Sequence, residues 1–73
     1  MFKEFDTVVL AETVPGAVTA VGAVGAIVDV LRHPQTAYLV EFCNDDGETL
    51  EILSLLPAQV ALKTPAHPQR RAA

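Results

Sequence analysis

Residues 37–53 of the chain are AYLVEFCNDDGETLEIL. In the first seven, Tyr38, Val40 and Phe42 recur at every second position, and this period is typical of a strand with one buried face. The opposite face of the strand predicted at 37–43 carries Leu39, Glu41 and Cys43.

A tight turn follows this strand. Residues 44–47 are Asn-Asp-Asp-Gly, and an Asp-Gly pair supplies the positive φ angles that short hairpins require. The sequence therefore predicts a hairpin, with a second strand at 49–53 paired back on the first. In that strand Leu50 and Ile52 are expected to face the core, and Thr49 and Glu51 to face solvent.

Working outward, short apolar runs rich in β-branched residues predict three further strands, at 7–10, 25–31 and 60–63. The strand at 25–31 has two different faces, with Val28 and Val30 on one and Ile27, Asp29 and Leu31 on the other.

The connections between these strands complete the fold prediction. The long connection at 11–22 contains Pro15 and Gly16, and these breakers argue against a helix there. A single 3-10 turn is expected at 56–59. Five short strands, a long loop after the first and a 3-10 turn before the last predict a small, five-stranded, all-β SH3-like barrel.

A family resemblance rests on four segments and on Val18. The segments are DTVVL at 6–10, GAVGAIV at 22–28, YLVEF at 38–42 and DGET at 46–49. Together they resemble an uncharacterised bacterial family of short stand-alone SH3-like barrel domains, and distantly the barrel of nitrile hydratase β subunits. The resemblance implies a cytoplasmic barrel with a docking role, since similar barrels also serve as small accessory subunits.

The size of the chain limits its stability. Its 73 residues suffice for one domain, placed at 1–63, followed by a flexible basic tail at 64–73. Cys43 is the only cysteine, so no internal disulfide supports so small a core. Because 51% of the residues are hydrophobic, we expect self-association to add stability. The lack of a secretory signal or spanning segment predicts a soluble, cytoplasmic protein.

Charge is distributed unevenly along the chain. Residues 1–62 hold all nine carboxylates and only Lys3 and Arg32, whereas residues 63–73 are basic. Nucleic-acid affinity comes mainly from Lys and Arg side chains that displace counterions, so the acidic body argues against a nucleic-acid partner. The same charge supports an alternative function, an acidic inhibitor or antitoxin-like protein that covers a basic site on a partner protein.

No group of residues predicts an active site. Ser54 is the only serine, and neither His33, beside Pro34, nor His67, in the tail, is placed to activate a nucleophile. We therefore expect a protein that is not an enzyme and has no cofactor. Cys43 is interpreted as a packing thiol, and no metal is expected, because no pair of these residues has ligand spacing.

Three other features have a structural explanation. The acidic run at 44–48 fits hairpin-turn chemistry better than a calcium loop. Gly22 and Gly25 fit a turn and a strand entry better than a phosphate loop, since a strand and not a helix follows them. The chain has no tryptophan and Tyr38 is its only tyrosine, so a groove for proline-rich ligands is not expected.

The sequence holds more apolar side chains than one small barrel encloses. Because large exposed apolar patches mark interfaces, the loop at 17–24 and one strand face are predicted to form a protein-binding surface. Its apolar members are Val18, Val21, Ile27, Leu31 and Leu39, and its acidic rim consists of Asp29, Glu41 and Glu51. In the alternative interpretation, the loop packs over the barrel end and hides these side chains.

Overall fold

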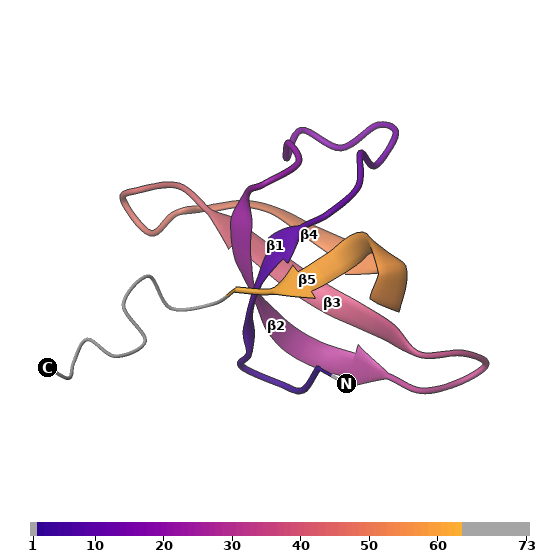
Figure 1. The fold of residues 1–73 in the computed structure, drawn as a ribbon. Helices are drawn as coiled ribbons and strands as arrows, with labels where there is room; N and C mark the ends of the chain where they lie inside the picture. The colour runs from indigo at the N-terminus through magenta and orange to yellow at the C-terminus, as the bar shows by residue number, and fades with distance from the viewer. Residues whose placement is uncertain (1, 64–73) are drawn as a thin grey trace, which may run out of the picture.

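The computed structural model describes residues 2–63, whose five strands form one antiparallel sheet. In chain order the elements are β1 (Thr7–Leu10), β2 (Val24–Leu31), β3 (Ala37–Cys43), β4 (Thr49–Leu55), the 3-10 turn η1 (Pro57–Gln59) and β5 (Val60–Leu62). The predicted SH3-like barrel is confirmed, with the long loop after β1 and the 3-10 turn before β5 (Figure 1). The tail predicted at 64–73 lies outside the described residues. No helix within residues 2–63 is long and apolar enough to cross a membrane.

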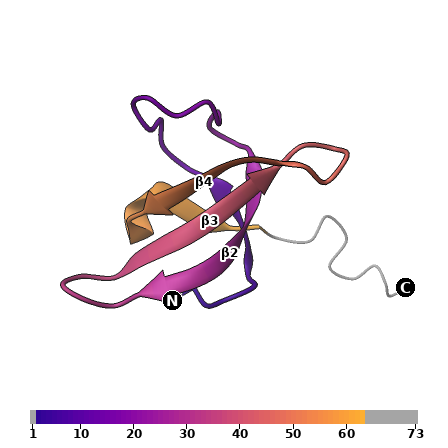
Figure 2. The same cartoon turned by 180° about the vertical axis from the view of Figure 1, so that it is seen from behind.

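The sheet has the strand order β4-β3-β2-β1-β5, so β1 pairs with both β2 and β5. Seen from behind, β2, β3 and β4 lie side by side (Figure 2), while β1 and β5 lie in front in Figure 1. The curled sheet encloses the core, which consists of Val8, Leu10, Ile27, Tyr38, Val40, Phe42, Leu55 and Val60. The ring of Phe2 packs edge-on against Tyr38, with the ring centroids 5.3 Å apart.

A bulge in β2 changes which side chains enter the core. Ile27 pairs with Val40, but the next pair is Asp29 with Leu39, so Val28 is the extra residue. Paired residues share a face of an antiparallel sheet, and Ile27 therefore joins Val40 in the core. The prediction that Ile27 lies on the same face as Asp29 is wrong, because the bulge interrupts the strict alternation on which it rested.

A second irregularity, between β3 and β4, reverses the predicted faces of β4. Phe42 pairs with Glu51 and Cys43 pairs with Thr49, which leaves Leu50 unpaired. Leu50 and Ile52 are accordingly 58% and 51% exposed, contrary to the prediction that they face the core. The inward positions are taken by later residues of β4, because Leu55 is buried and Leu53 packs against the core.

Gly25 lets β2 approach the core side chains of β3. A Cβ atom at this position would lie 2.8 Å from Cδ1 and Cε1 of Phe42 and 2.8 Å from Cγ1 of Val40. These separations are well below van der Waals contact, so the barrel needs glycine here for space.

Replacing Gly25 by alanine tests this close approach. We expect Gly25→Ala to lower the free energy of unfolding by about 1–3 kcal/mol, the usual cost of overpacking a filled core. Chemical denaturation followed by circular dichroism would measure the loss. In a Phe42→Leu background, which removes the ring, the same substitution should cost less, and an equal cost in both backgrounds would contradict the assigned contact.

Candidate functional site

The long loop between β1 and β2 (residues 11–23) stands above the barrel in Figure 1. Two glycines allow its reversals, since Gly16 and Gly22 have φ angles of +84° and +94°. Its base is tied to β1, because the amide of Leu10 donates to the carbonyl of Ala23 and the amide of Gly22 donates to the carbonyl of Leu10. Val14 and Ala23 pack against the core, so the loop has two internal anchors.

The carboxylate of Glu51 fixes the far part of this loop. It accepts hydrogen bonds from the amides of Val18 (3.1 Å) and Thr19 (3.0 Å) and from the Thr19 hydroxyl (2.6 Å). The Thr19 hydroxyl, followed by the Val18 amide, holds the pKa of Glu51 below its ordinary value. Glu51 was predicted for the acidic rim of the binding surface. It was also expected to face solvent, and that prediction is wrong, because its register opposite Phe42 turns it toward the loop.

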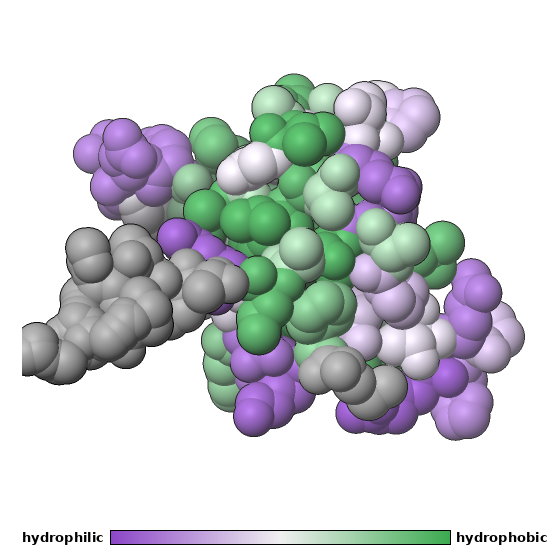
Figure 3. All heavy atoms as spheres, in the orientation of Figure 1, coloured by the Kyte–Doolittle hydropathy of each residue, from purple (hydrophilic) through white to green (hydrophobic). Residues whose placement is uncertain are grey.

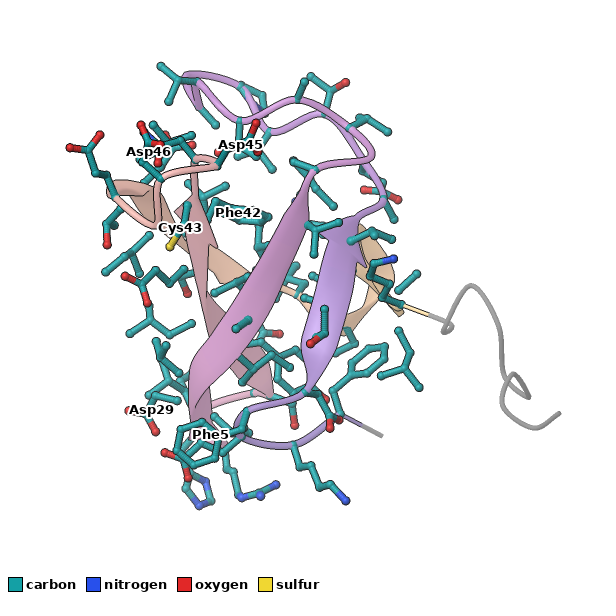
Figure 4. The ribbon with its side chains drawn as sticks, turned by 90° about the vertical axis from the view of Figure 1, so that its left-hand side faces the viewer. Phe5, Asp29, Phe42, Cys43, Asp45 and Asp46 are labelled. Atoms are coloured by element: carbon teal, nitrogen blue, oxygen red, sulfur yellow. The ribbon has the colours of Figure 1, made fainter. Side chains whose placement is uncertain are left out.

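A groove lies between this loop and the turn of the β3–β4 hairpin. Its volume is about 510 Å³. It is lined by Val18, Thr19, Ala23, Val24, Phe42, Cys43, Asp45 and Leu50. Figure 4 shows Cys43, Asp45 and Asp46 together at one end of the sheet, and Asp29 and Phe5 at the other. Five of the eight lining side chains are hydrocarbon, so the groove is suited to an apolar segment with a polar or cationic flank.

A smaller hollow continues the groove. It has a volume of about 270 Å³, and its lining residues are Thr7, Val24, Gly25, Ala26, Glu41 and Cys43. Val24 and Cys43 line both depressions, so they form one path over β1, β2 and β3.

The hairpin wall of the groove is held by one side chain. Oδ1 of Asn44 accepts hydrogen bonds from the amides of Asp46 and Glu48, both at 2.9 Å, and Nδ2 donates to Glu48 Oε1 at 2.9 Å. Gly47 has a φ of +84°, as the Asp-Gly turn requires. The turn thus has a defined shape in which Asp45 and Asp46 are exposed.

Comparison with known protein families gives one result. A family model for a domain of unknown function, DUF4926, matches residues 4–62, which include all five strands. The chain belongs to the DUF4926 family. Comparisons with curated proteins and with solved structures gave no match. The predicted membership of an uncharacterised domain family is therefore confirmed, and the function of this DUF4926 domain has to be argued from its surface.

The residues predicted for the binding surface divide into three groups. Val18 is 78% exposed on the loop and lines the groove, and Val21 is also exposed. Leu31, Leu39, Asp29 and Glu41 lie on the outer face of the sheet, the side of β2, β3 and β4 turned away from the core. Ile27 is 0% exposed and cannot line a surface, which corrects its assignment.

The outer face also contains Leu50 and Ile52, which were predicted to face the core, and Val24, the last residue of the loop predicted at 17–24. Val24 and Leu50 line the groove, and Ile52 pairs with Glu41 next to it. Cys43 is exposed beside them, so its interpretation as a packing thiol is wrong. The alternation of side chains along β3 already placed Cys43 opposite the core face, so its outward position could be predicted from the sequence. The positions of Leu50 and Ile52 depend on the pairing register and had no local signal.

Within residues 2–63, the candidate nucleophiles and bases of this DUF4926 domain are not brought together, and His67 lies outside the described residues. His33 lies in the exposed connection between β2 and β3, whereas Cys43 ends β3 at its opposite end. Ser54 pairs with Leu39 and is exposed on the outer face. In the part of the chain that the structure describes, no three His, Cys, Asp or Glu residues are grouped to hold a metal ion.

The contact between Glu51 and the loop makes the loop sensitive to acid. The pKa of Glu51 is lower in the folded protein than in the unfolded chain. The stabilising hydrogen bonds of its carboxylate are therefore fully present at a pH above the pKa of the unfolded chain. They are lost as the pH falls through the pKa of the folded protein. We expect the Val18 and Thr19 amides to be protected from hydrogen exchange near neutral pH. That protection should fall only as the pH drops below the ordinary titration range of a glutamate, because the pKa of Glu51 is lowered.

The substitution Glu51→Gln should weaken the protection of both amides already at neutral pH and remove its dependence on acid. Glu12→Gln is the matched control, because Glu12 is an exposed glutamate of the same loop and makes none of these contacts. Exchange measured by NMR that is equal in the Glu51→Gln variant and the unsubstituted protein would contradict the assignment.

Proposed function

We propose that this DUF4926 domain is a non-enzymatic protein-binding module that self-associates through the outer face of β2, β3 and β4 and the groove beside it. The observation that carries the proposal is the number of large apolar side chains left in solvent. They are Phe5, Val18, Val21, Val24, Leu31, Leu50, Ile52, Leu56 and Leu62. Three of them, Val18, Val24 and Leu50, line the groove together, and exposed apolar patches mark interaction surfaces in small proteins.

The arrangement of the apolar and acidic residues supports the same proposal. Val18, Val24 and Leu50 meet in the groove, and the carboxyl groups of Asp45 and Glu41 flank them. An apolar centre with a polar rim is the usual anatomy of a protein interface. Figure 3 shows apolar residues over the long loop, β1 and β5, and hydrophilic residues at the tips of the two hairpins. Exposed apolar residues are thus present on the front of the barrel as well as in the groove.

The small core gives self-association an energetic reason. Eight hydrophobic residues form the buried core, and a domain of this size buries only about 60% of the surface of its unfolded chain. Burying an exposed leucine contributes about 1.5–3 kcal/mol, so covering Leu50 and its neighbours would add much to a marginal fold. The free thiol of Cys43 supports a cytoplasmic location for this assembly. We also propose, from the sequence resemblance alone, that the protein is bacterial and that its barrel is related to that of nitrile hydratase β subunits.

A second candidate function is favoured by charge. Residues 2–63 contain nine carboxylates against Lys3, Arg32 and Lys63, and Asp45, Asp46 and Glu48 project from one exposed turn. Such a surface suits an acidic inhibitor that covers a basic site on another protein. Ionic strength separates the two functions, since screening weakens charge-driven binding and leaves apolar docking largely unchanged.

Self-association is tested by the oligomeric mass of a pair of leucine variants. Light scattering coupled to size-exclusion chromatography should give a mass above the 7.8 kDa of one chain. Leu50→Lys, in the groove, should reduce the mass to that of a monomer. Leu56→Lys should leave the assembly intact, because Leu56 lies between β4 and η1, is 44% exposed and does not line the groove.

Circular dichroism should show that both variants keep the strand signal, since both side chains are already exposed. A monomeric mass for the unsubstituted protein at two concentrations would remove self-association from the proposal. Equal loss of assembly in both variants would show that the groove is not the surface involved.

A further inference from the structure

The groove and the hollow below it form a continuous path across the outer face. The path begins at Thr7 in β1, crosses Val24 and Cys43, and ends at Asp45 in the hairpin turn. Figure 4 shows the Cys43 end of this path, with the carboxylates of Asp45 and Asp46 beside it. No lysine or arginine lines either depression, whereas Glu41 and Asp45 do.

The described chain ends at the other end of this path. The amide of Lys63, the residue after β5, donates a hydrogen bond of 3.0 Å to the carbonyl of Thr7. Thr7 itself lines the hollow, so the last described residue, Lys63, lies at its wall.

The sequence after Lys63 is positively charged, whereas the charged side chains that line the path are all negative. Residues 64–73 are TPAHPQRRAA, with Arg70 and Arg71 as their only permanent cations and no carboxylate side chain. The turn at the end of the path carries Asp45 and Asp46, both exposed. Guanidinium groups pair well with carboxylates, and an exposed carboxylate pair attracts them at short range.

The length of the segment matches the path. The segment follows β5, and three strand spacings of about 4.8 Å separate β5 from β3, about 14 Å in all. The two residues from Cys43 to Asp45 add about 7 Å of extended chain. Arg70 follows Lys63 by seven residues, two of them prolines, and a proline-containing extended chain covers about 3.1 Å per residue, or about 22 Å.

We propose that residues 64–73 dock along this path in the same chain, with Arg70 and Arg71 against the carboxylates of Asp45 and Asp46. The proposal rests on the assignment of the groove as a binding surface, and it adds regulation of that surface. A partner protein or a second copy has to displace the segment before it reaches Val24, Cys43 and Leu50. Conditions that weaken the arginine–carboxylate contacts, such as high salt, therefore expose the groove.

A spin label near the end of the segment tests the docking in samples dilute enough for light scattering to give the mass of a single chain. Cys43 is the only cysteine, so the label is placed by Ala72→Cys in a Cys43→Ser chain of full length. Docking should cause loss of the amide NMR signals of Val24, Asp45 and Asp46 while the label is paramagnetic. The signals of Arg32 and Gln35, in the opposite hairpin, should keep their intensity. Arg70→Glu together with Arg71→Glu should restore the lost signals.

The matched control is Lys3→Glu together with Arg32→Glu, which changes the net charge equally but lies off the path, and in it the signal loss should persist. Full intensity at Val24 and Asp45 in the labelled protein would overturn the proposal. A mixture of isotope-labelled protein with spin-labelled, unenriched protein should show no loss; equal loss there would assign the contact to a neighbouring copy and also overturn it. The Leu50→Lys comparison of masses, made in the chain with Arg70→Glu and Arg71→Glu, in which the segment no longer docks, separates failure of this docking from failure of the proposed function.

Discussion

The pairing of Phe42 with Glu51 across β3 and β4 determines most of what this barrel presents to solvent. Residues that oppose each other in an antiparallel pair share a face, so this pairing sends Leu53 and Leu55 toward the core. A slip of one residue would exchange the two faces of β4. It would also remove the carboxylate of Glu51 from the loop amides that it binds. One register therefore sets the core, the loop position and the outer face together.

The strand positions were predictable because they depend on local signals. The alternation at 37–43 gave β3 its observed bounds, and the Asp-Gly pair gave the turn that follows. The bulges at Val28 and Leu50 were not predictable in this way. An extra residue in one strand is defined only by the partner strand, and nothing in either local pattern marks it. The wrong faces assigned to Ile27, Leu50 and Ile52 all follow from these two insertions.

The existence of an exposed apolar surface was predictable from the sequence, but only some of the residues that form it were. An excess of apolar residues does not depend on register, so the expectation of an exposed apolar surface needed composition alone. Which residues form it depends on contacts between distant segments. The groove joins Val18 of the loop to Leu50 of β4, and Glu51 holds that loop from a strand that no local pattern connects to it. The role of Glu51 was missed because a lone glutamate in a strand has the pattern of a solvent-facing residue.

The two faces of the sheet are under different packing constraints. The inner positions of β3, Tyr38, Val40 and Phe42, are fully packed, and Gly25 leaves no room beside them. The outer positions carry no such packing demand, since Leu50 and Ile52 are in solvent in the isolated domain. Substitutions there alter the exposed surface at little cost to the fold, whereas substitutions inside alter the fold first. The fold thus constrains the inner positions far more than the outer ones, which is why the family fold by itself does not specify a partner.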